Sequence, residues 1–166
     1  VVRLKGGDPM VFGRGGEEWL HLAALGIDVE VVPGISSAVA VPALAGIPLT
    51  LRGVAASFAV VTGHRIAGAD FDWEAYARIG TLIVLMGVSQ RAAIAAALLM
   101  HGRAASTPVA WIEQGSTVDQ RVVVTTLGQM AAVEVESPAV LVVGEVVNVR
   151  SRLLGAESLI DYSERS

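Results

Sequence analysis

Short apolar runs rich in valine and isoleucine alternate with helix-like segments along most of this chain of 166 residues. After residue 55, five runs are expected to be strands: Phe58–Thr62, Thr81–Met86, Val109–Ile112, Arg121–Thr126 and Val140–Val147. The runs are continuously apolar rather than strictly alternating, which is typical of strands that are buried on both faces. The sequence therefore predicts an α/β fold in which helices cover both faces of the sheet.

Helices are expected at segments that carry start and stop signals. One is predicted over Trp73–Arg78 after the capping residue Asp72, and another over Gln90–His101, which stops at Gly102. The first fifty residues repeat the alternation with four expected elements: strands over Val1–Leu4 and Val29–Val32, and helices over Glu17–Leu25 and Ala38–Ala45, the latter capped by Ser36 or Ser37.

The stretch PLTLRGVAAS, residues 48–57, interrupts this alternation and places a domain boundary near residue 50. We expect residues 1–50 to belong to one α/β domain and residues 51–150 to belong to a second. Residues 151–166 are expected to form a polar tail that frays.

Composition narrows the possible function classes. The net charge is −4 and no run of lysine and arginine occurs, which argues against a nucleic-acid partner. The chain has no cysteine, which excludes disulfides and fits a reducing compartment. The three histidines lack metal-ligand spacing, so no metal is expected. The uncharged stretch Val31–Leu51 contains Pro33, Pro42 and Pro48, so it is not expected to cross a membrane as one helix.

The first expected strand is followed, after Lys5, by the sequence Gly6-Gly7-Asp8-Pro9. Glycines at the carboxyl end of a strand let backbone N–H groups approach a ligand closely, and Asp8 adds an acceptor. The alternative is a simple strand-to-helix turn, in which such residues are common. The glycines that follow, at Gly13, Gly15 and Gly16, match neither a dinucleotide loop nor a P-loop.

Five stretches of the chain together resemble the tetrapyrrole methylase family, in its uroporphyrinogen-III C-methyltransferase branch. They are RLKGGDPMVFGRGGEE (3–18), VVPGISSAVAVPALAGIPLTLR (31–52), VTGH (61–64), LMG (85–87) and VVGEVV (142–147). The resemblance implies two α/β domains with the active site between them, the first domain being incomplete here. It also implies two methyl transfers from S-adenosylmethionine to uroporphyrinogen III. The product would be precorrin-2, on the way to sirohaem and cobalamin, and the enzyme a cytoplasmic homodimer.

The family begins with a glycine-rich V-G-x-G-P-G-D loop followed by residues credited with proton transfer, and this chain contains neither. We therefore expect an N-terminally truncated form that is inactive as an isolated fragment, and we assign no catalytic residue. The alternative is a non-catalytic remnant of the same fold that binds the donor or has a structural role.

The resemblance also implies which residues bind the methyl donor: Gly6, Gly7, Asp8, Val11, Ser36, Ser37, Met86 and Gly115. A sulfonium with an amino-acid head and an adenosine body needs backbone donors and acceptors, a carboxylate or hydroxyl, and an apolar slot. Structural roles are the alternatives: the two serines as a helix cap, Met86 as a core residue and Gly115 as a turn.

The acceptor implied by the resemblance is a polycarboxylate, which the net negative charge of the protein would repel. Local arginines must therefore bind it, and we expect Arg14, Glu17 and Arg52 to be the substrate-binding residues. Arg121 is a third possible arginine. The role of His64, at the end of the VTGH stretch, is left open.

Overall fold

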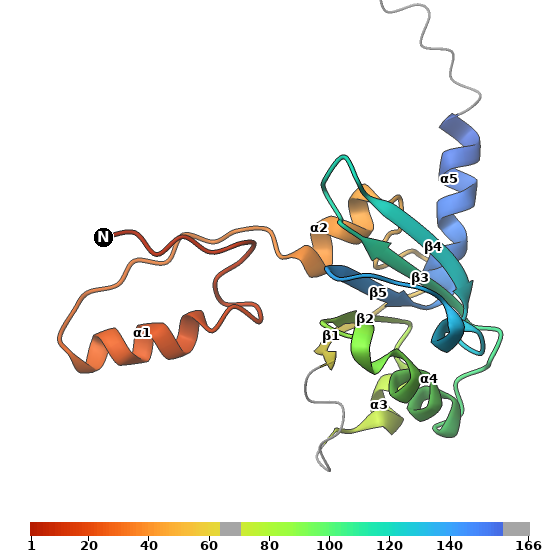
Figure 1. The fold of residues 1–166 in the computed structure, drawn as a ribbon, viewed down its shortest axis with the longest axis horizontal. Helices are drawn as coiled ribbons and strands as arrows, with labels where there is room; N and C mark the ends of the chain where they lie inside the picture. Colours follow the sequence, from red (N-terminus) through yellow and green to blue (C-terminus); the bar gives the residue numbers. More distant parts are fainter. Residues whose placement is uncertain (64–70, 158–166) are drawn as a thin grey trace, which may run out of the picture.

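A mixed five-stranded sheet forms the centre of the computed structural model, which describes residues 1–63 and 71–157 (Figure 1). Its strands are β1 (Phe58–Thr62), β2 (Thr81–Leu85), β3 (Pro108–Glu113), β4 (Arg121–Thr126) and β5 (Ala139–Val143), in the order β1-β2-β5-β3-β4. Strand β1 is parallel to β2, whereas β5 is antiparallel to both β2 and β3. Strand β4 is antiparallel to β3. All five predicted strands are present, and β1, β2 and β3 share one direction.

Both faces of the sheet are covered, as the apolar runs predicted. On one face, Ile83 of β2 and Ala110 of β3 pack with Ala38 and Val41 of helix α2 (Ser37–Leu44). On the other face, the core includes Trp111 of β3 and the buried residues of helix α4 (Arg91–Met100). Alternate residues of each central strand thus point into two separate cores.

The helices of the second half begin and end close to their predicted positions. Helix α3 (Trp73–Arg78) is capped by Asp72, whose side chain accepts a hydrogen bond from the N–H of Ala75 at 3.0 Å. Residues 71–157 also contain three short 3₁₀ helices: η2 (Val88–Gln90), η3 (Met130–Ala132) and η4 (Glu145–Asn148).

The predicted strand over Val140–Val147 is wrong beyond Val143. Strand β5 ends before Gly144, which has a φ of 146°, and a Cβ placed there would lie 2.4 Å from the carbonyl oxygen of Gly80, so only glycine fits where the chain leaves the sheet. The next residues form η4, which buries Val146 and Val147. Helix α5 (Val149–Glu157) then projects from the sheet where a frayed tail was expected, and residues 158–166 lie outside the described part.

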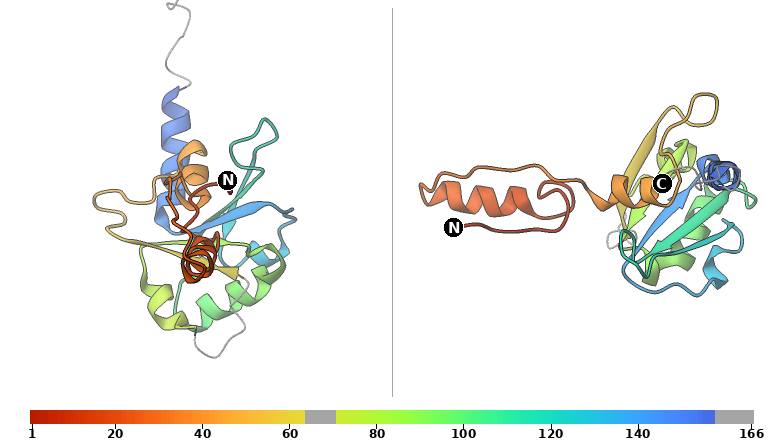
Figure 2. Two further views of the ribbon diagram at one scale, coloured as in Figure 1. Left: turned by 90° about the vertical axis from the view of Figure 1, so that its left-hand side faces the viewer. Right: turned by 90° about the horizontal axis from the view of Figure 1, so that it is seen from above.

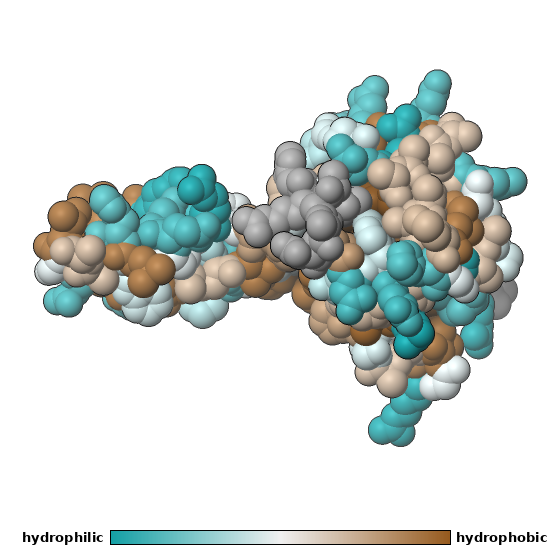
Figure 3. Space-filling model, turned by 90° about the horizontal axis from the view of Figure 1, so that it is seen from below, coloured by the Kyte–Doolittle hydropathy of each residue, from teal (hydrophilic) through white to brown (hydrophobic). Residues whose placement is uncertain are grey.

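Residues 1–35 extend away from the sheet as an arm in which one extended limb precedes helix α1 (Gly15–Ala24) and another follows it (Figures 1 and 2). The strands predicted over Val1–Leu4 and Val29–Val32 are wrong, because neither segment pairs in a ladder within the described residues. Helix α1 has no buried residue. Apolar side chains, with Leu20 74% and Val32 75% exposed, gather on the surface of the arm (Figure 3).

The described residues form one α/β domain with the arm attached to it. Helix α2 shares the core of the sheet although it precedes the boundary predicted near residue 50. No helix within residues 1–63 and 71–157 is long and apolar enough to cross a membrane.

Candidate functional site

A cleft of about 650 Å³ lies where the arm meets the carboxyl ends of β2 and β3. We call it the strand-end cleft. Its walls consist of Gly6, Val11, Phe12, Ser37, Val41, Leu85, Met86, Val88, Ser89, Ile112, Gln114, Gly115, Thr117, Ser137, Pro138, Ala139 and Val140. None of these side chains is charged. The volume is in the range of about 300–1,000 Å³ that is usual for small-molecule sites, and apolar walls with a few hydroxyl and amide groups are the usual chemistry of such sites.

The backbone around the strand-end cleft adopts conformations that side chains rarely permit. Phe12, Met86 and Gln114 line the cleft with φ values of 52°, 55° and 47°. Met86 and Gln114 are the residues that directly follow β2 and β3. Left-handed backbone at non-glycine residues is costly and concentrates at functional sites, so this pattern marks the cleft as a candidate site.

Close packing also fixes the loop after β3 against helix α2. A Cβ placed on Gly115 would lie 2.5 Å from the side chain of Val41, so only glycine fits at this position without a shift. A similar approach occurs between the ends of β1 and β2, where a Cβ on Gly63 would lie 2.4 Å from the carbonyl oxygen of Met86.

The structure brings five of the eight predicted donor-binding residues to the strand-end cleft: Gly6, Val11, Ser37, Met86 and Gly115. They come from the arm, from the start of α2 and from the ends of β2 and β3. Their contact with a donor stays a prediction, but their convergence from four segments of the sequence on one cleft is a structural fact.

The other three predicted donor-binding residues do not line this cleft. The carboxylate of Asp8 accepts hydrogen bonds from the N–H groups of Met10 at 2.8 Å and Gly34 at 3.2 Å, and so joins the two limbs of the arm. Gly7, with a φ of 76°, lies at the same crossing. Ser36 is the N-cap of α2, and its Oγ accepts a hydrogen bond from the N–H of Ala38 at 3.2 Å.

Sequence reasoning missed several residues that line the strand-end cleft. Leu85, Ile112 and Gln114 could have been found, because they lie at or beside the carboxyl ends of predicted strands. The segment 137–140, which contains the cis peptide bond between Ser137 and Pro138, gave no such signal.

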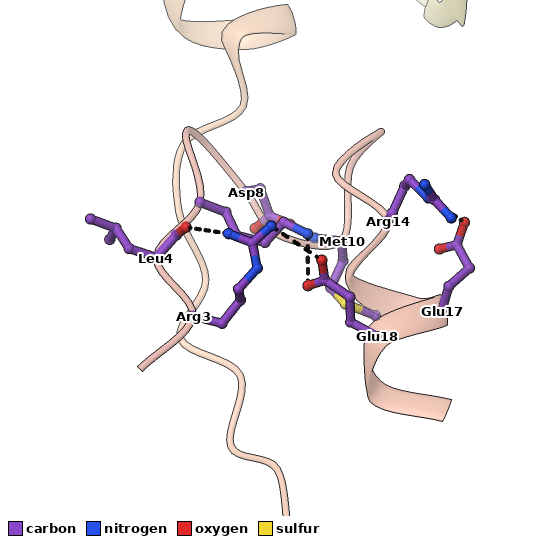
Figure 4. A network of polar contacts seen from close by, with 8 residues as sticks. Arg3, Leu4, Asp8, Met10, Arg14, Glu17 and Glu18 are labelled. Carbon is purple, nitrogen blue, oxygen red and sulfur yellow. Dashed lines mark hydrogen bonds and ion pairs between the residues drawn. The ribbon is translucent and has the colours of Figure 1, made fainter. Parts of the chain in front are cut away.

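A second cavity, of about 450 Å³, lies within the arm and is lined mainly by charged side chains. We call it the arm pocket, and its lining residues are Arg3, Lys5, Gly13, Arg14, Glu17, Glu18 and His21. Two of the predicted substrate-binding residues, Arg14 and Glu17, point toward each other there with 3.6 Å between Nε and Oε1 (Figure 4). Both side chains are largely exposed, at 81% and 65%, so the pair is weak and can exchange for a ligand group.

Glu18 also lines the arm pocket. It accepts a hydrogen bond from Lys5 Nζ at 2.8 Å and contacts Arg3 at 3.4 Å. The Lys5 hydrogen bond holds the pKa of the Glu18 carboxyl below its usual value, so Glu18 stays charged to a lower pH than an unpaired glutamate.

The remaining residues considered from sequence lie elsewhere. Arg52 is exposed, lines neither cavity and makes no hydrogen bond or ion pair with other described residues. Arg121 forms a two-point ion pair with Glu113, and His64 lies outside the described residues. Within residues 1–63 and 71–157, no cluster of three or more acidic or histidine side chains could hold a metal ion.

Comparison with protein-family models matches residues 1–131 to the family described as Tetrapyrrole (Corrin/Porphyrin) Methylases. Among relatives, the chain is 48% identical to the S-adenosyl-L-methionine-dependent uroporphyrinogen III methyltransferase of Methanosarcina barkeri, covering 98% of this chain and 67% of that protein. It is 50% identical to Siroheme synthase 1 of Yersinia pseudotuberculosis, covering 92% of this chain and 33% of that protein. The chain thus spans about a third of the siroheme synthase.

Among solved structures, the chain is similar to the uroporphyrin-III C-methyl transferase of Thermus thermophilus complexed with S-adenyl homocysteine. The TM-score is 0.81 and the identity 50%, and the match covers 90% of this chain and 67% of that one. The mixed sheet described above is therefore part of the fold of that enzyme.

Proposed function

Since this chain belongs to the tetrapyrrole methylase family, we propose that it acts in the S-adenosylmethionine-dependent C-methylation of uroporphyrinogen III to precorrin-2, in sirohaem or cobalamin biosynthesis. The observation that carries the proposal is the convergence of Gly6, Val11, Ser37, Met86 and Gly115 on the strand-end cleft. A relative at 50% identity was solved with S-adenyl homocysteine, which supports a donor of this class.

The lining of the strand-end cleft fits such a donor. Val41, Leu85 and Ile112 provide an apolar wall for an adenosine body, and the Ser37 hydroxyl and the Gln114 amide provide hydrogen-bonding groups. The donor supplies an electrophilic methyl group on a sulfonium. Because the lining contains no charged side chain, this chain would hold the donor through backbone dipoles and neutral polar groups rather than through a direct ion pair.

For the acceptor, we propose that Arg14 binds a carboxylate through two of its guanidinium N–H groups while Glu17 accepts hydrogen bonds from pyrrole N–H groups. The ion pair between Arg14 and Glu17 is exposed, so breaking it to bind the acceptor costs little free energy. Arg52, which has no partner among the described residues, is proposed to hold a second carboxylate. Catalysis would then depend mainly on bringing the nucleophilic pyrrole carbon in line with the methyl group.

The proposal includes an architecture of two α/β domains, with residues 1–50 in the first, residues 51–150 in the second and residues 151–166 as a tail. It also includes a homodimer in the cytoplasm. We propose further that these 166 residues alone bind the donor without turning over the acceptor, since helix α1, which follows Arg14 and carries Glu17, buries no residue, and no described segment of the arm pairs in the sheet. The second candidate, a non-catalytic donor-binding module, is favoured by the same observation.

Calorimetry with S-adenosylhomocysteine tests the donor site. The protein should bind it, and Ser37→Trp, which adds a large side chain to a residue that lines the cleft, should weaken binding at least about tenfold, or 1.4 kcal/mol. Ser57→Trp is the matched control, because Ser57 is also exposed but precedes β1 and does not line the cleft. Equal affinities for all three proteins would refute the donor site.

Methyl transfer from labelled S-adenosylmethionine to uroporphyrinogen III tests the acceptor step. Transfer above that of a heat-treated control would show that the chain is an active methyltransferase by itself. Donor binding without transfer would favour the donor-binding module for the isolated residues.

A further inference from the structure

A buried carboxylate lies directly behind the strand-end cleft, at the last residue of β3. Only 5% of Glu113 is exposed. Its Oε2 accepts a hydrogen bond from Arg121 Nε at 2.5 Å, and its Oε1 accepts one from an Arg121 terminal nitrogen at 2.7 Å. The same Oε1 also accepts a hydrogen bond from the N–H of Glu136 at 2.7 Å. The carboxylate therefore joins the end of β3 to the start of β4 and to the segment that leads into β5.

Arg121 adds a fourth connection. Its terminal nitrogen also donates to the carbonyl oxygen of Glu134 at 3.1 Å. The pair thus ties the segment 134–136 at two points, one through each side chain. A planar guanidinium and a carboxylate in two-point contact fix orientation as well as distance.

Both segments held by this pair continue directly into the lining of the strand-end cleft. Gln114, Gly115 and Thr117 follow Glu113, and residues 137–140 follow Glu136. The two walls also contact each other, because the N–H of Gln114 donates to the carbonyl oxygen of Pro138 at 3.0 Å. Glu113 itself does not line the cleft, so its influence on a ligand acts through these walls.

The wall after β3 needs such support. Gln114 and Ser116 have left-handed backbone, with φ values of 47° and 70°. Strained backbone conformations of this kind persist only where several surrounding contacts hold them in place. A buried ion pair is by itself weak evidence for stability, because apolar side chains could join the same strands. Apolar side chains could not hold segment 134–136 in one orientation, however, because they make no directional hydrogen bonds.

We propose that Glu113, held by Arg121, is a positioning residue that fixes both walls of the strand-end cleft in the arrangement that binds the methyl donor. This inference rests on the proposed function. Glu113→Gln would keep the shape of the side chain, but its amide N–H groups would face the N–H donors of Arg121 or the N–H of Glu136.

The test measures S-adenosylhomocysteine affinity by calorimetry for the protein, Glu113→Gln and Arg121→Lys. We expect Glu113→Gln to weaken binding about tenfold. Arg121→Lys keeps the charge on a half-exposed side chain but loses the two-point contact, so a roughly threefold weakening is expected. Glu74→Gln breaks an exposed pair with Arg78 on α3, away from the cleft, and should not change the affinity.

A purely structural role is separated by two further measurements. Arg103→Lys, at the opposite end of the sheet, should lower the unfolding midpoint without changing donor affinity. In Glu113→Gln, the NMR amide resonances of Gly115 and Ala139 should shift while those of α3 stay in place.

Failure of the protein itself to bind S-adenosylhomocysteine would refute the proposed function. Binding by the protein with unchanged affinity in both Glu113→Gln and Arg121→Lys would overturn the inference alone. An affinity loss in Arg103→Lys equal to that in Glu113→Gln would also overturn it, because the effect would then follow stability and not position.

Discussion

Substituting Gly115 by alanine tests how tightly the strand-end cleft is built. The added Cβ would lie 2.5 and 2.6 Å from the two Cγ atoms of Val41 and 3.0 Å from its Cβ. Carbon atoms in contact normally lie about 3.5–4.0 Å apart, so the loop or α2 must move by about 1 Å. Overpacking of this size typically costs about 1–3 kcal/mol of unfolding free energy. Because Gly115 and Val41 both line the cleft, the same movement should weaken donor binding.

The structure also predicts which second substitution restores the fit. Val41→Ala removes both Cγ atoms and should by itself cost about 1.5–3 kcal/mol, since Val41 is buried. In the double variant the new Cβ meets only the atom at 3.0 Å, so the cost of Gly115→Ala should largely disappear. We expect a coupling free energy of about 1–2 kcal/mol between the two sites.

Urea unfolding of the protein, both single variants and the double variant measures this coupling. Gly6→Ala is the matched control: Gly6 also lines the cleft, but a Cβ there meets no atom within 4 Å, so its stability should hardly change. Additive effects of Gly115→Ala and Val41→Ala would refute the steric argument, as would a cost for Gly6→Ala equal to that for Gly115→Ala.

Three further predictions concern charged side chains. Arg103→Met should lower the free energy of unfolding, measured in urea, by about 2–3 kcal/mol. The Arg103 guanidinium donates to the carbonyl oxygen of Ile79 at 2.9 Å and to those of Gly80 and Val143 at 3.3 Å, and methionine cannot replace these hydrogen bonds. Arg150→Met, which loses one contact at 3.0 Å, is the control and should cost less. The Arg121 hydrogen bond lowers the pKa of Glu113, so the stability it contributes is present above about pH 4.5 and is lost as the pH falls through the lowered pKa. The urea unfolding midpoints of the protein and of Glu113→Gln should therefore converge as the pH falls below the lowered pKa of Glu113. A difference between the midpoints that stays constant with pH would contradict the argument. Arg14→Lys should weaken tetrapyrrole binding by roughly thirtyfold, or about 2 kcal/mol, in a fluorescence titration while donor affinity stays the same. A loss of donor affinity instead would assign this part of the arm to the donor.

Strand prediction succeeded where a segment has neighbours to pair with and failed where it has none. Thr81–Leu85 and Pro108–Glu113 are fully buried central strands, and their apolar runs were recognised from sequence. Val1–Leu4 and Val29–Val32 are also rich in valine but remain unpaired on the arm within the described residues. A β-branched run fits a pleated and half-buried surface, but the run alone does not supply the neighbouring strand.

Part of the candidate site could also be predicted from the sequence, and part of it could not. The ends of parallel strands could be predicted as ligand-binding positions, and Met86 and Gly115 at two such ends do line the strand-end cleft. The wall formed by residues 137–140 could not be predicted, because it is the amino end of a strand whose antiparallel direction no local pattern reveals. Glu113 was missed for the same reason, since its partners Arg121 and Glu136 meet it only when β3, β4 and β5 are placed side by side.

Asp8 shows why residue type and position are insufficient to identify a ligand contact. Carboxylates after glycine pairs serve both as ligand acceptors and as turn residues, and the two roles have the same local sequence. In the structure, both oxygens of Asp8 accept backbone hydrogen bonds, from Met10 and from Gly34 on the opposite limb of the arm. The partner at Gly34 lies 26 residues away in the chain. Asp8 therefore stabilises the crossing of the limbs, which sets where Gly6 and Val11 meet the strand-end cleft. These two hydrogen bonds assign Asp8 a structural role in the arm, and its direct contact with a donor stays a prediction.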